Sequence, residues 1–352
     1  MSRASISTRC NAQWKKSNVA GLHSRLTLAL EAGDVVLPEA ARIAVFGPRP
    51  DHDLSALPEG RCHILTGFRP DHDHFAGQGH SCAVVPEGRY GASVVFLPRA
   101  KALARALVAQ AVAVTDGVVI VDGAKTDGIE SLLKDCRTRA AVSAPLSKAH
   151  GKLFWFQAGP GFEDWAGDGP QEIEGGFVTA PGVFSADGID PASRFLADHL
   201  PVKLGKSVAD LGGGWGYLSG RILERADIQV LHLVEADHAA LDCARRNIAD
   251  PRAVLHWEDV TRWRPEAALD TVVTNPPFHA GRAADPDLGR AFIAAAAAML
   301  KPGGQLWLVA NRHLPYETAM GAQFRSVEEV AGDARFKILH GKGPKGPSRN
   351  RS

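Results

Sequence analysis

The sequence has few cysteines, and their arrangement excludes several classes of protein. The five cysteines are scattered, and none stands in a Cys-x-x-Cys pair: Cys10, Cys62, Cys82, Cys136 and Cys243. An odd, scattered set argues against a disulfide framework or a cysteine-rich zinc module and favours a reducing compartment. No apolar run approaches the roughly 20 residues that span a bilayer, and no secretory signal is recognisable. We therefore expect a cytoplasmic protein that has no membrane partner.

An excess of charge of one sign is also lacking. The chain carries 40 basic and 39 acidic residues, which gives a net charge of +1. Without a global basic field, any surface that binds nucleic acid must be local. Both ends are basic, because the first acid is Glu31 and no acid follows Phe336. Two interpretations stay open: solvated tails, or arms that contact phosphates.

Length and composition indicate two folded domains. The 352 residues are 45% hydrophobic and 22% charged, which is the usage of a soluble globular protein. Glycine and proline crowd residues 158–182, so a linker is predicted near residue 165. A run of histidine and aspartate at 71–74, with cysteines nearby, lacks the regular ligand spacing of a zinc site. No metal is expected.

Strands and helices alternate in the second half of the sequence. Strands are predicted at 207–211, 229–234, 254–257, 269–274 and 305–310, with helices at 217–226, 238–248 and 289–300. This alternation predicts an α/β fold with a doubly wound, mostly parallel sheet. The first half repeats the pattern faintly, with strands at 42–46, 63–66, 93–97 and 117–121 and a helix at 100–114. Its first strand is followed by Gly47-Pro48-Arg49-Pro50, where the prolines remove backbone N–H groups that a ligand cradle needs, which predicts a duplicated domain without a cofactor site.

A glycine turn follows the first strand of the second half. Gly212, Gly214 and Gly216 allow a tight turn and a close approach to a ligand. Asp210 precedes them and would repel a pyrophosphate, but it suits an ammonium group. Glu235 ends the next strand, where a carboxylate can accept both hydroxyls of a ribose. These features together predict S-adenosylmethionine as the cofactor. An acid after the third strand can accept a hydrogen bond from the adenine amino group, and we prefer Asp259 over its neighbour Glu258 for this role.

A second motif follows the fourth strand and reads Asn275-Pro276-Pro277-Phe278. The Asn275 amide oxygen and the Pro276 carbonyl can both accept from one planar amino group, while the two prolines fix the backbone. Phe278 offers a flat face for stacking a base. No strong general base is needed, because a nitrogen that attacks a sulfonium can lose its proton afterwards and positioning supplies most of the rate. We assign the four residues to catalysis, and Asn275 also to the edge of the cofactor site.

These motifs, in the order DLGGGWG, VEAD and NPPF, resemble the class I S-adenosylmethionine-dependent methyltransferases that act on exocyclic amino groups. PGVFS at 181–185, NPPFH at 275–279 and ANRHLPY at 310–316 are more narrowly similar to the bacterial ribosomal RNA small subunit methyltransferase C group. The resemblance implies two tandem Rossmann-like methyltransferase domains, of which the N-terminal one is degenerate and helps to hold RNA. It also implies transfer of a methyl group to the N2 amine of a flipped guanine in 16S ribosomal RNA, within the small ribosomal subunit.

The resemblance sets the expected domain organisation. We expect a basic extension at 1–20, a degenerate domain at 21–160, a linker at 161–180, a catalytic domain at 181–340 and a basic tail at 341–352. Alternative acceptors for the same chemistry are adenine N6 in nucleic acid and a glutamine amide in protein. An alternative of another class is a non-catalytic RNA-binding or ribosome-assembly protein, which the intact Asp210, Glu235 and Asn275 disfavour. A nicotinamide dehydrogenase is a distant third, disfavoured by Asp210 and by the Asn-Pro-Pro-Phe turn.

Overall fold

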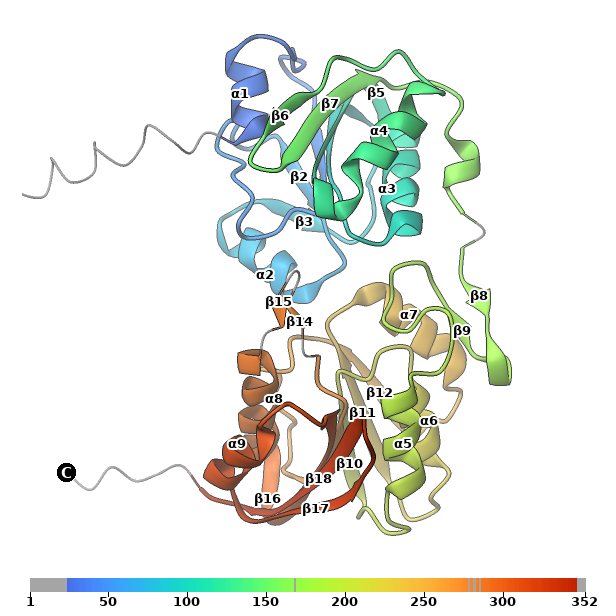
Figure 1. The fold of residues 1–352 in the computed structure, drawn as a ribbon, viewed down its shortest axis with the longest axis vertical. Helices are drawn as coiled ribbons and strands as arrows, with labels where there is room; N and C mark the ends of the chain where they lie inside the picture. The colour runs from blue at the N-terminus through green and yellow to red at the C-terminus, as the bar shows by residue number, and fades with distance from the viewer. Residues whose placement is uncertain (1–23, 168, 278, 281–282, 285, 347–352) are drawn as a thin grey trace, which may run out of the picture. The chain divides into compact units, whose positions relative to one another are not determined.

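The computed structural model describes residues 24–346 except 168, 278, 281–282 and 285. The chain divides into two compact units (Figure 1). The first takes residues up to Thr66 and His74–Gly167, and the second takes Gly67–Asp73 and the chain from Asp168 onwards. Within the described residues, no helix is long and apolar enough to cross a membrane.

The first unit is built on a seven-stranded sheet in the order β3-β2-β1-β4-β5-β7-β6. Its strands are β1 (Ile43–Phe46), β2 (Cys62–Leu65), β3 (Ser81–Ala83), β4 (Tyr90–Phe96), β5 (Thr115–Ala124), β6 (Leu146–Lys148) and β7 (Gly151–Gln157). Its helices are α1 (Arg25–Glu31), α2 (Arg69–Gly77, which begins in the second unit), α3 (Lys101–Val114) and α4 (Ile129–Arg137). The pairs from β3 to β5 are parallel, while β7 is antiparallel to both β5 and β6.

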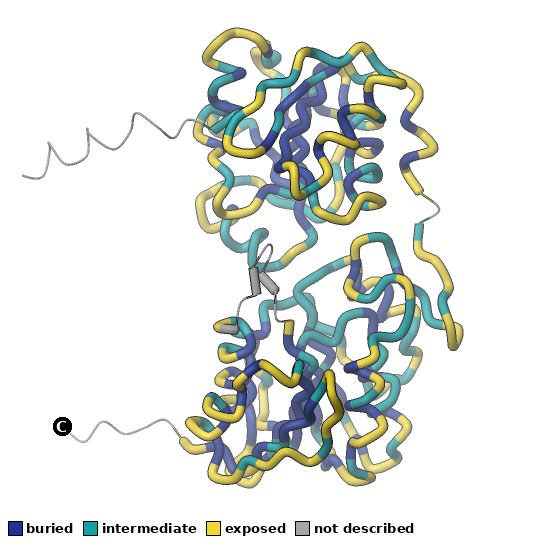
Figure 2. The backbone as a smooth tube through the Cα atoms, in the orientation of Figure 1, coloured by how far each residue is buried: buried dark blue, intermediate teal, exposed yellow. Residues whose placement is uncertain are grey.

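The core of this unit lies on both faces of its sheet. Helix α1 packs on one face against β1 residues such as Ile43 and Val45. Helices α3 and α4 pack on the other face, against Ala44 and Phe46 among others. Every residue of β1 is buried, as expected for a parallel strand covered on both faces. Figure 2 shows that the buried backbone gathers in the interior of the unit. From Gly47 to Arg61 the chain forms turns and contains no helix.

The second unit has a seven-stranded sheet in the order β12-β11-β10-β13-β16-β18-β17. Its strands are β10 (Ser207–Leu211), β11 (Val230–Glu235), β12 (Ala253–Trp257), β13 (Leu269–Thr274), β16 (Leu300–Asn311), β17 (Phe324–Gly332) and β18 (Phe336–Pro344). Its helices are α5 (Pro191–His199), α6 (Tyr217–Leu223), α7 (His238–Asn247), α8 (Pro286–Met299) and α9 (Tyr316–Gln323). Short hairpins are formed by β8 (Gln171–Glu172) with β9 (Val178–Thr179), and by β14 (His279–Ala280) with β15 (Ala283–Ala284).

The two sheets share one topology. In each, a parallel run is completed by an antiparallel pair, and the chain visits the strand positions in the same order. In the second unit, α5 and α6 pack on one face of the sheet, while α8 and α9 pack on the other (Figure 1). The fold class expected from the sequence, two tandem and mostly parallel α/β sheets, is confirmed.

The C-terminal segment differs from the sequence-based expectation. Strand β18 continues to Pro344, so the sheet extends into the segment expected to be a tail. Lys337 is only 4% exposed, and its Nζ lies 2.5 Å from Oε1 of Glu317. Lys337 belongs to the basic C-terminal end but does not fit either a solvated tail or an arm that contacts phosphates, because pairing with β16 buries it in the sheet. Residues 1–23 and 347–352 lie outside the described part of the chain.

The region predicted as a linker contains short elements of structure. A 3-10 turn, η2 (Glu163–Trp165), closes the first unit, and Trp165 is buried in that unit's core. The β8–β9 hairpin then belongs to the second unit, which includes the chain from Asp168.

Candidate active site

The parallel register of the second sheet brings the predicted site residues to one edge. Leu211 of β10 pairs with Val234 of β11 on one side and with Thr274 of β13 on the other. Glu235 and Asn275 each stand one residue beyond these partners, so they flank the turn that follows β10. Ligands of open α/β sheets bind at this carboxyl edge.

The glycine turn connects β10 to α6. Gly212, Gly214 and Gly216 all have positive φ values, of 70°, 55° and 95°. A Cβ at Gly216 would lie 2.7 Å from Cδ1 of Ile248, so this glycine is needed for packing as well as for backbone conformation. A Cβ at Gly214 would meet nothing within 4 Å, because this residue faces open space. Gly214 therefore leaves its backbone accessible to a ligand.

Asp210 is a buried carboxylate next to the turn. Its side chain is fully buried, and Ser219 Oγ donates a hydrogen bond of 2.8 Å to its Oδ2. Its Oδ1 has no hydrogen-bond partner among the described residues. The pKa of Asp210 is raised to about 7, mainly by burial and also by the nearby Glu235 carboxylate, against the lowering effect of the Ser219 hydrogen bond. A buried acceptor without a donor requires an explanation, and a cationic ligand group would supply one.

Glu235 joins the end of β11 to the glycine turn. Its Oε2 accepts from the backbone N–H of Gly214 at 2.8 Å, and its Oε1 accepts from that of Asp237 at 2.8 Å. Burial raises the pKa of Glu235 to about 7, and these backbone hydrogen bonds oppose the shift. Because each carboxylate oxygen can accept more than one hydrogen bond, the fixed carboxylate retains capacity for ligand hydroxyls.

Asp259 begins a tight turn two residues after β12. Its Oδ1 accepts from the backbone N–H of Thr261 at 2.8 Å and from Oγ1 of the same residue at 2.7 Å. Its backbone oxygen accepts from the amides of Arg262 and Trp263. The hydrogen bonds fix the position of this carboxylate at the sheet edge, and contact with adenine stays a prediction.

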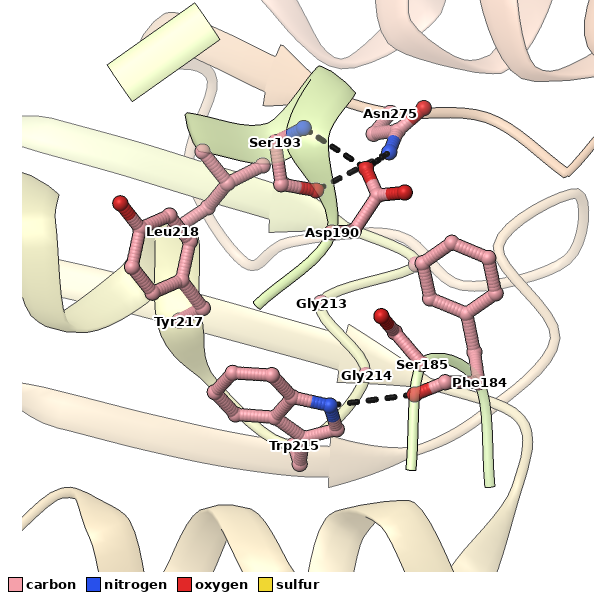
Figure 3. Close-up of a pocket in the computed structure, with 11 residues that line it drawn as sticks. Phe184, Ser185, Asp190, Ser193, Gly213, Gly214, Trp215, Tyr217, Leu218 and Asn275 are labelled. Carbon is pink, nitrogen blue, oxygen red and sulfur yellow. Dashed lines mark hydrogen bonds between the residues drawn. The ribbon is translucent and has the colours of Figure 1, made fainter. Parts of the chain in front are cut away.

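A pocket that is partly open to solvent lies against the glycine turn (Figure 3). Its lining residues are Phe184, Ser185, Asp190, Ser193, Gly212, Gly213, Gly214, Trp215, Tyr217, Leu218 and Asn275. Of the predicted site residues, Gly212, Gly214 and Asn275 line it, whereas Asp210, Gly216, Glu235, Asp259, Pro276 and Pro277 do not. Pro276 is buried and Pro277 is exposed. Phe278 lies outside the described residues.

Two hydrogen bonds hold the side chain of Asn275. Its Nδ2 donates to Oδ2 of Asp190 at 3.0 Å and to Oγ of Ser193 at 2.9 Å (Figure 3). Because an ionised carboxylate only accepts hydrogen bonds, the Asn275 atom that faces Asp190 must be its NH2 group. The amide oxygen of Asn275 is therefore directed away from Asp190 and can accept a hydrogen bond from a ligand.

Sequence reasoning missed the residues that α5 and the preceding loop contribute. Asp190 is the N-cap of α5, and Pro191 follows at the first helical position. That pair is a recognisable helix-start signal, but nothing in it points to Asn275. Phe184 lies in the PGVFS motif at 181–185 but has no role predicted from the sequence. Its carbonyl accepts a hydrogen bond from Nε1 of Trp215 at 3.1 Å, and the residue is 57% exposed.

Comparisons with known proteins identify the relatives of this chain. A model of the methyltransferase small domain matches residues 174–340. Ribosomal RNA small subunit methyltransferase C of Shewanella oneidensis is 29% identical over 266 residues, which cover 72% of this chain and 78% of that protein. Ribosomal RNA large subunit methyltransferase G of Streptomyces avermitilis is 38% identical over 179 residues, and the match covers 49% of this chain and 47% of that protein.

A solved structure matches both units of the chain. It is that of a T. thermophilus 16S rRNA N2 methyltransferase in complex with AdoMet and guanosine, with a TM-score of 0.76 and 25% sequence identity. The match covers 92% of this chain and 93% of that protein. The motif order, the shared fold and these matches agree: the second unit matches a methyltransferase domain, and over most of its length the chain is similar to the S-adenosylmethionine-dependent methyltransferases of the ribosomal RNA small subunit methyltransferase C family.

Proposed function

We propose that this enzyme transfers a methyl group from S-adenosylmethionine to the exocyclic N2 amine of a guanine in 16S ribosomal RNA. The observation that carries the proposal is the orientation of Asn275 at the pocket. Its NH2 group is held by Asp190 and Ser193, which leaves its oxygen as an acceptor beside the glycine turn. An acceptor in this place suits a substrate amino group.

The residues of the second unit fit the cofactor. We assign the ammonium group to the side of Asp210, whose Oδ1 lacks a partner among the described residues, and the ribose hydroxyls to Glu235. Gly214 leaves room for close approach, and Asp259 is assigned to the adenine amino group. When bound, S-adenosylmethionine supplies an electrophilic methyl group on a sulfonium.

The remaining chemistry is the positioning of the guanine amine. Asn275 Oδ1 and the Pro276 carbonyl accept its two hydrogens, which fixes the plane of the amine and directs the nitrogen lone pair toward the methyl group. Pro276 and Pro277 restrict the backbone of this turn. We assign the face of the base to Phe278. The proton is released to water after methyl transfer, so these residues act by orientation, which is worth several kcal/mol in reactions of this kind.

The comparisons support small-subunit RNA as the partner, and we propose that the protein acts on it in the cytoplasm. The small subunit methyltransferase C relatives match over most of their own length, whereas the match to the large subunit relative covers about half of it. The solved 16S rRNA N2 relative shares both units. We infer that the first unit is a degenerate methyltransferase domain that supports folding and RNA binding, because it repeats the strand order but has no glycine turn and no helix between β1 and β2.

The test is transfer of labelled methyl groups to assembled small subunits, large subunits, free ribosomal RNA and total protein, followed by digestion to nucleosides. We expect N2-methylguanosine from small-subunit material. Labelled methyladenosine, or label in protein, would contradict the proposed acceptor while leaving the cofactor site intact. A full-length Asn275→Ala variant is the matched control for background transfer.

A further inference from the structure

The amide of Asn275 is held by the start of a helix that lies far away in the sequence. Asp190 and Ser193 precede Asn275 by 85 and 82 residues, and both belong to the first turn of α5. One oxygen, Oδ2 of Asp190, accepts two hydrogen bonds, from the Ser193 backbone N–H at 2.7 Å and from Nδ2 of Asn275 at 3.0 Å. The carboxylate therefore caps the helix and fixes the amide at the same time.

The orientation of this amide decides what the pocket can recognise. An asparagine side chain rotated by 180° would present its NH2 group to the ligand in place of its oxygen. Facing a substrate amino group, that NH2 would place donor against donor, and the amine would lose one of its two acceptors. Rotation would also bring the amide oxygen against the Asp190 carboxylate, where two acceptors repel each other.

We propose that Asp190 and Ser193 are positioning residues, which lock the Asn275 amide with its oxygen toward the pocket and so select an amino group as the methyl acceptor. This inference rests on the proposed function and deepens it. Helix capping does not account for the arrangement, because capping needs only the hydrogen bond to the Ser193 backbone. The hydrogen bonds from Asn275 to Ser193 Oγ and to Asp190 are additional to the cap, and both hold the amide.

Substitutions at Asp190 can separate capping from positioning. Serine is about as good an N-cap as aspartate, so Asp190→Ser keeps the start of α5, but its side chain is too short to hold Asn275 as well. Asparagine is also a good N-cap and retains one oxygen that can accept both hydrogen bonds. We expect Asp190→Ser to lower kcat by about 100-fold, the scale of a misplaced reacting group, and Asp190→Asn to stay within about threefold of wild type.

The same variants give further readouts that a purely structural role would not move. The Kd for S-adenosylmethionine and the Tm of Asp190→Ser should both stay close to wild type. In an Asn275→Ala background, Asp190→Ser should cause no further loss of kcat, because Asp190 acts through Asn275. Ser193→Ala should cause a smaller loss than Asp190→Ser, because the carboxylate still holds the amide.

A measurement without any substrate distinguishes this inference from the proposed function. In ¹⁵N NMR spectra of the full chain, the Asn275 side-chain signals are identified by their loss in Asn275→Ala. Wild type and Asp190→Asn should show slow exchange of these amide hydrogens with solvent, and Asp190→Ser should show fast exchange. Equal exchange in all three, or an equal loss of kcat in Asp190→Ser and Asp190→Asn, would overturn the inference. If wild type transfers no methyl group to any RNA while the exchange pattern holds, the proposed function fails and the lock on Asn275 stands.

Discussion

Replacing Asp210 with asparagine should stabilise the protein that lacks cofactor and weaken cofactor binding. The carboxyl is fully buried, one of its oxygens has no partner among the described residues, and the acidic Glu235 lies close enough to raise its pKa further. Each of these factors penalises the ionised form of Asp210 in the folded state. An amide of nearly the same shape carries no charge and avoids this penalty.

The size of the effect depends on the pKa of Asp210. Raising it from 3.8 to about 7 corresponds to roughly 4 kcal/mol of destabilisation once the group is ionised. The asparagine would leave a buried NH2 group without a partner where Oδ1 now lies, at a cost of about 1–3 kcal/mol. The net gain in the free energy of unfolding is therefore about 2 kcal/mol at pH 8.

The pH dependence of the free energy of unfolding tests whether ionised Asp210 destabilises the folded state. Between about pH 4 and pH 7 the folded protein holds a proton on Asp210 that the unfolded chain has released. Wild type should therefore lose stability as the pH rises through this window and level off above it. Asp210→Asn lacks this contribution but keeps that of Glu235, whose pKa is also raised to about 7. The variant should be no more stable than wild type at pH 4 and more stable at pH 8.

The assay is urea unfolding at pH 4, 6 and 8, followed through the transition that S-adenosylmethionine shifts, since that transition reports the second unit. The Kd for cofactor should rise at least about tenfold in Asp210→Asn, in keeping with loss of a hydrogen bond to a charged group. Glu235→Gln is the comparison, because both Glu235 oxygens accept from backbone N–H groups and an amide cannot accept with both of its atoms. It should gain less stability than Asp210→Asn. An Asp210→Asn variant that is less stable than wild type at pH 8 would refute the reasoning.

Three further predictions concern other parts of the second unit. Asn275→Ala should lower methyl transfer to small subunits at least about 100-fold while the calorimetric Kd for cofactor stays near wild type; equal loss of both would remove its assigned role. Gly216→Ala should lower the free energy of unfolding by at least about 2 kcal/mol, because the φ of this residue is 95° and the new Cβ would lie 2.7 Å from an isoleucine side-chain atom. Gly214 has space for a Cβ, so Gly214→Ala should lose less stability than Gly216→Ala and more affinity for the cofactor. Glu317→Ala should lower the free energy of unfolding by more than about 2 kcal/mol, because it leaves the buried Lys337 charge unpaired. Lys337→Met should lower it by less. If urea unfolding shows the reverse order, the ion pair is not what holds β18 and α9 together.

Local sequence was sufficient for the elements that bear the catalytic motifs. The strands at Ser207–Leu211 and Leu269–Thr274 have the boundaries that the sequence predicts. Both are short apolar runs that end at a chain breaker, glycine in one case and the Asn-Pro-Pro turn in the other. Buried parallel strands produce such runs because both faces are covered. The register of the sheet then places the glycine turn and the Asn-Pro-Pro turn at one edge.

Local sequence was not sufficient where a distant partner decides the structure. Strand β17 contains several charged residues and β18 is rich in glycine and lysine, so neither has the apolar pattern of a buried strand. Pairing with β16 supplies the hydrogen bonds that make β18 a strand, and β18 in turn pairs with β17. The same limit applies to Asp190, whose sequence context predicts a helix start but not the amide that it holds 85 residues later.

The two units show which parts of a shared topology serve packing and which serve binding. Strand β1 has the position of β10, and its penultimate residue is the buried Val45, where β10 has Asp210. By the register of the two sheets, Thr66 stands where the second unit has Glu235, and Phe96 stands where it has Asn275. The apolar Val45 and Phe96, and the loss of a carboxylate at Thr66, are consistent with a sheet edge that no longer needs acceptors for a polar ligand. The replacements of Asp210 and Asn275 also remove a buried or half-buried polar group that costs stability unless a ligand satisfies it. The first unit therefore keeps the fold at lower energetic cost, and the second accepts that cost at the one edge where it binds.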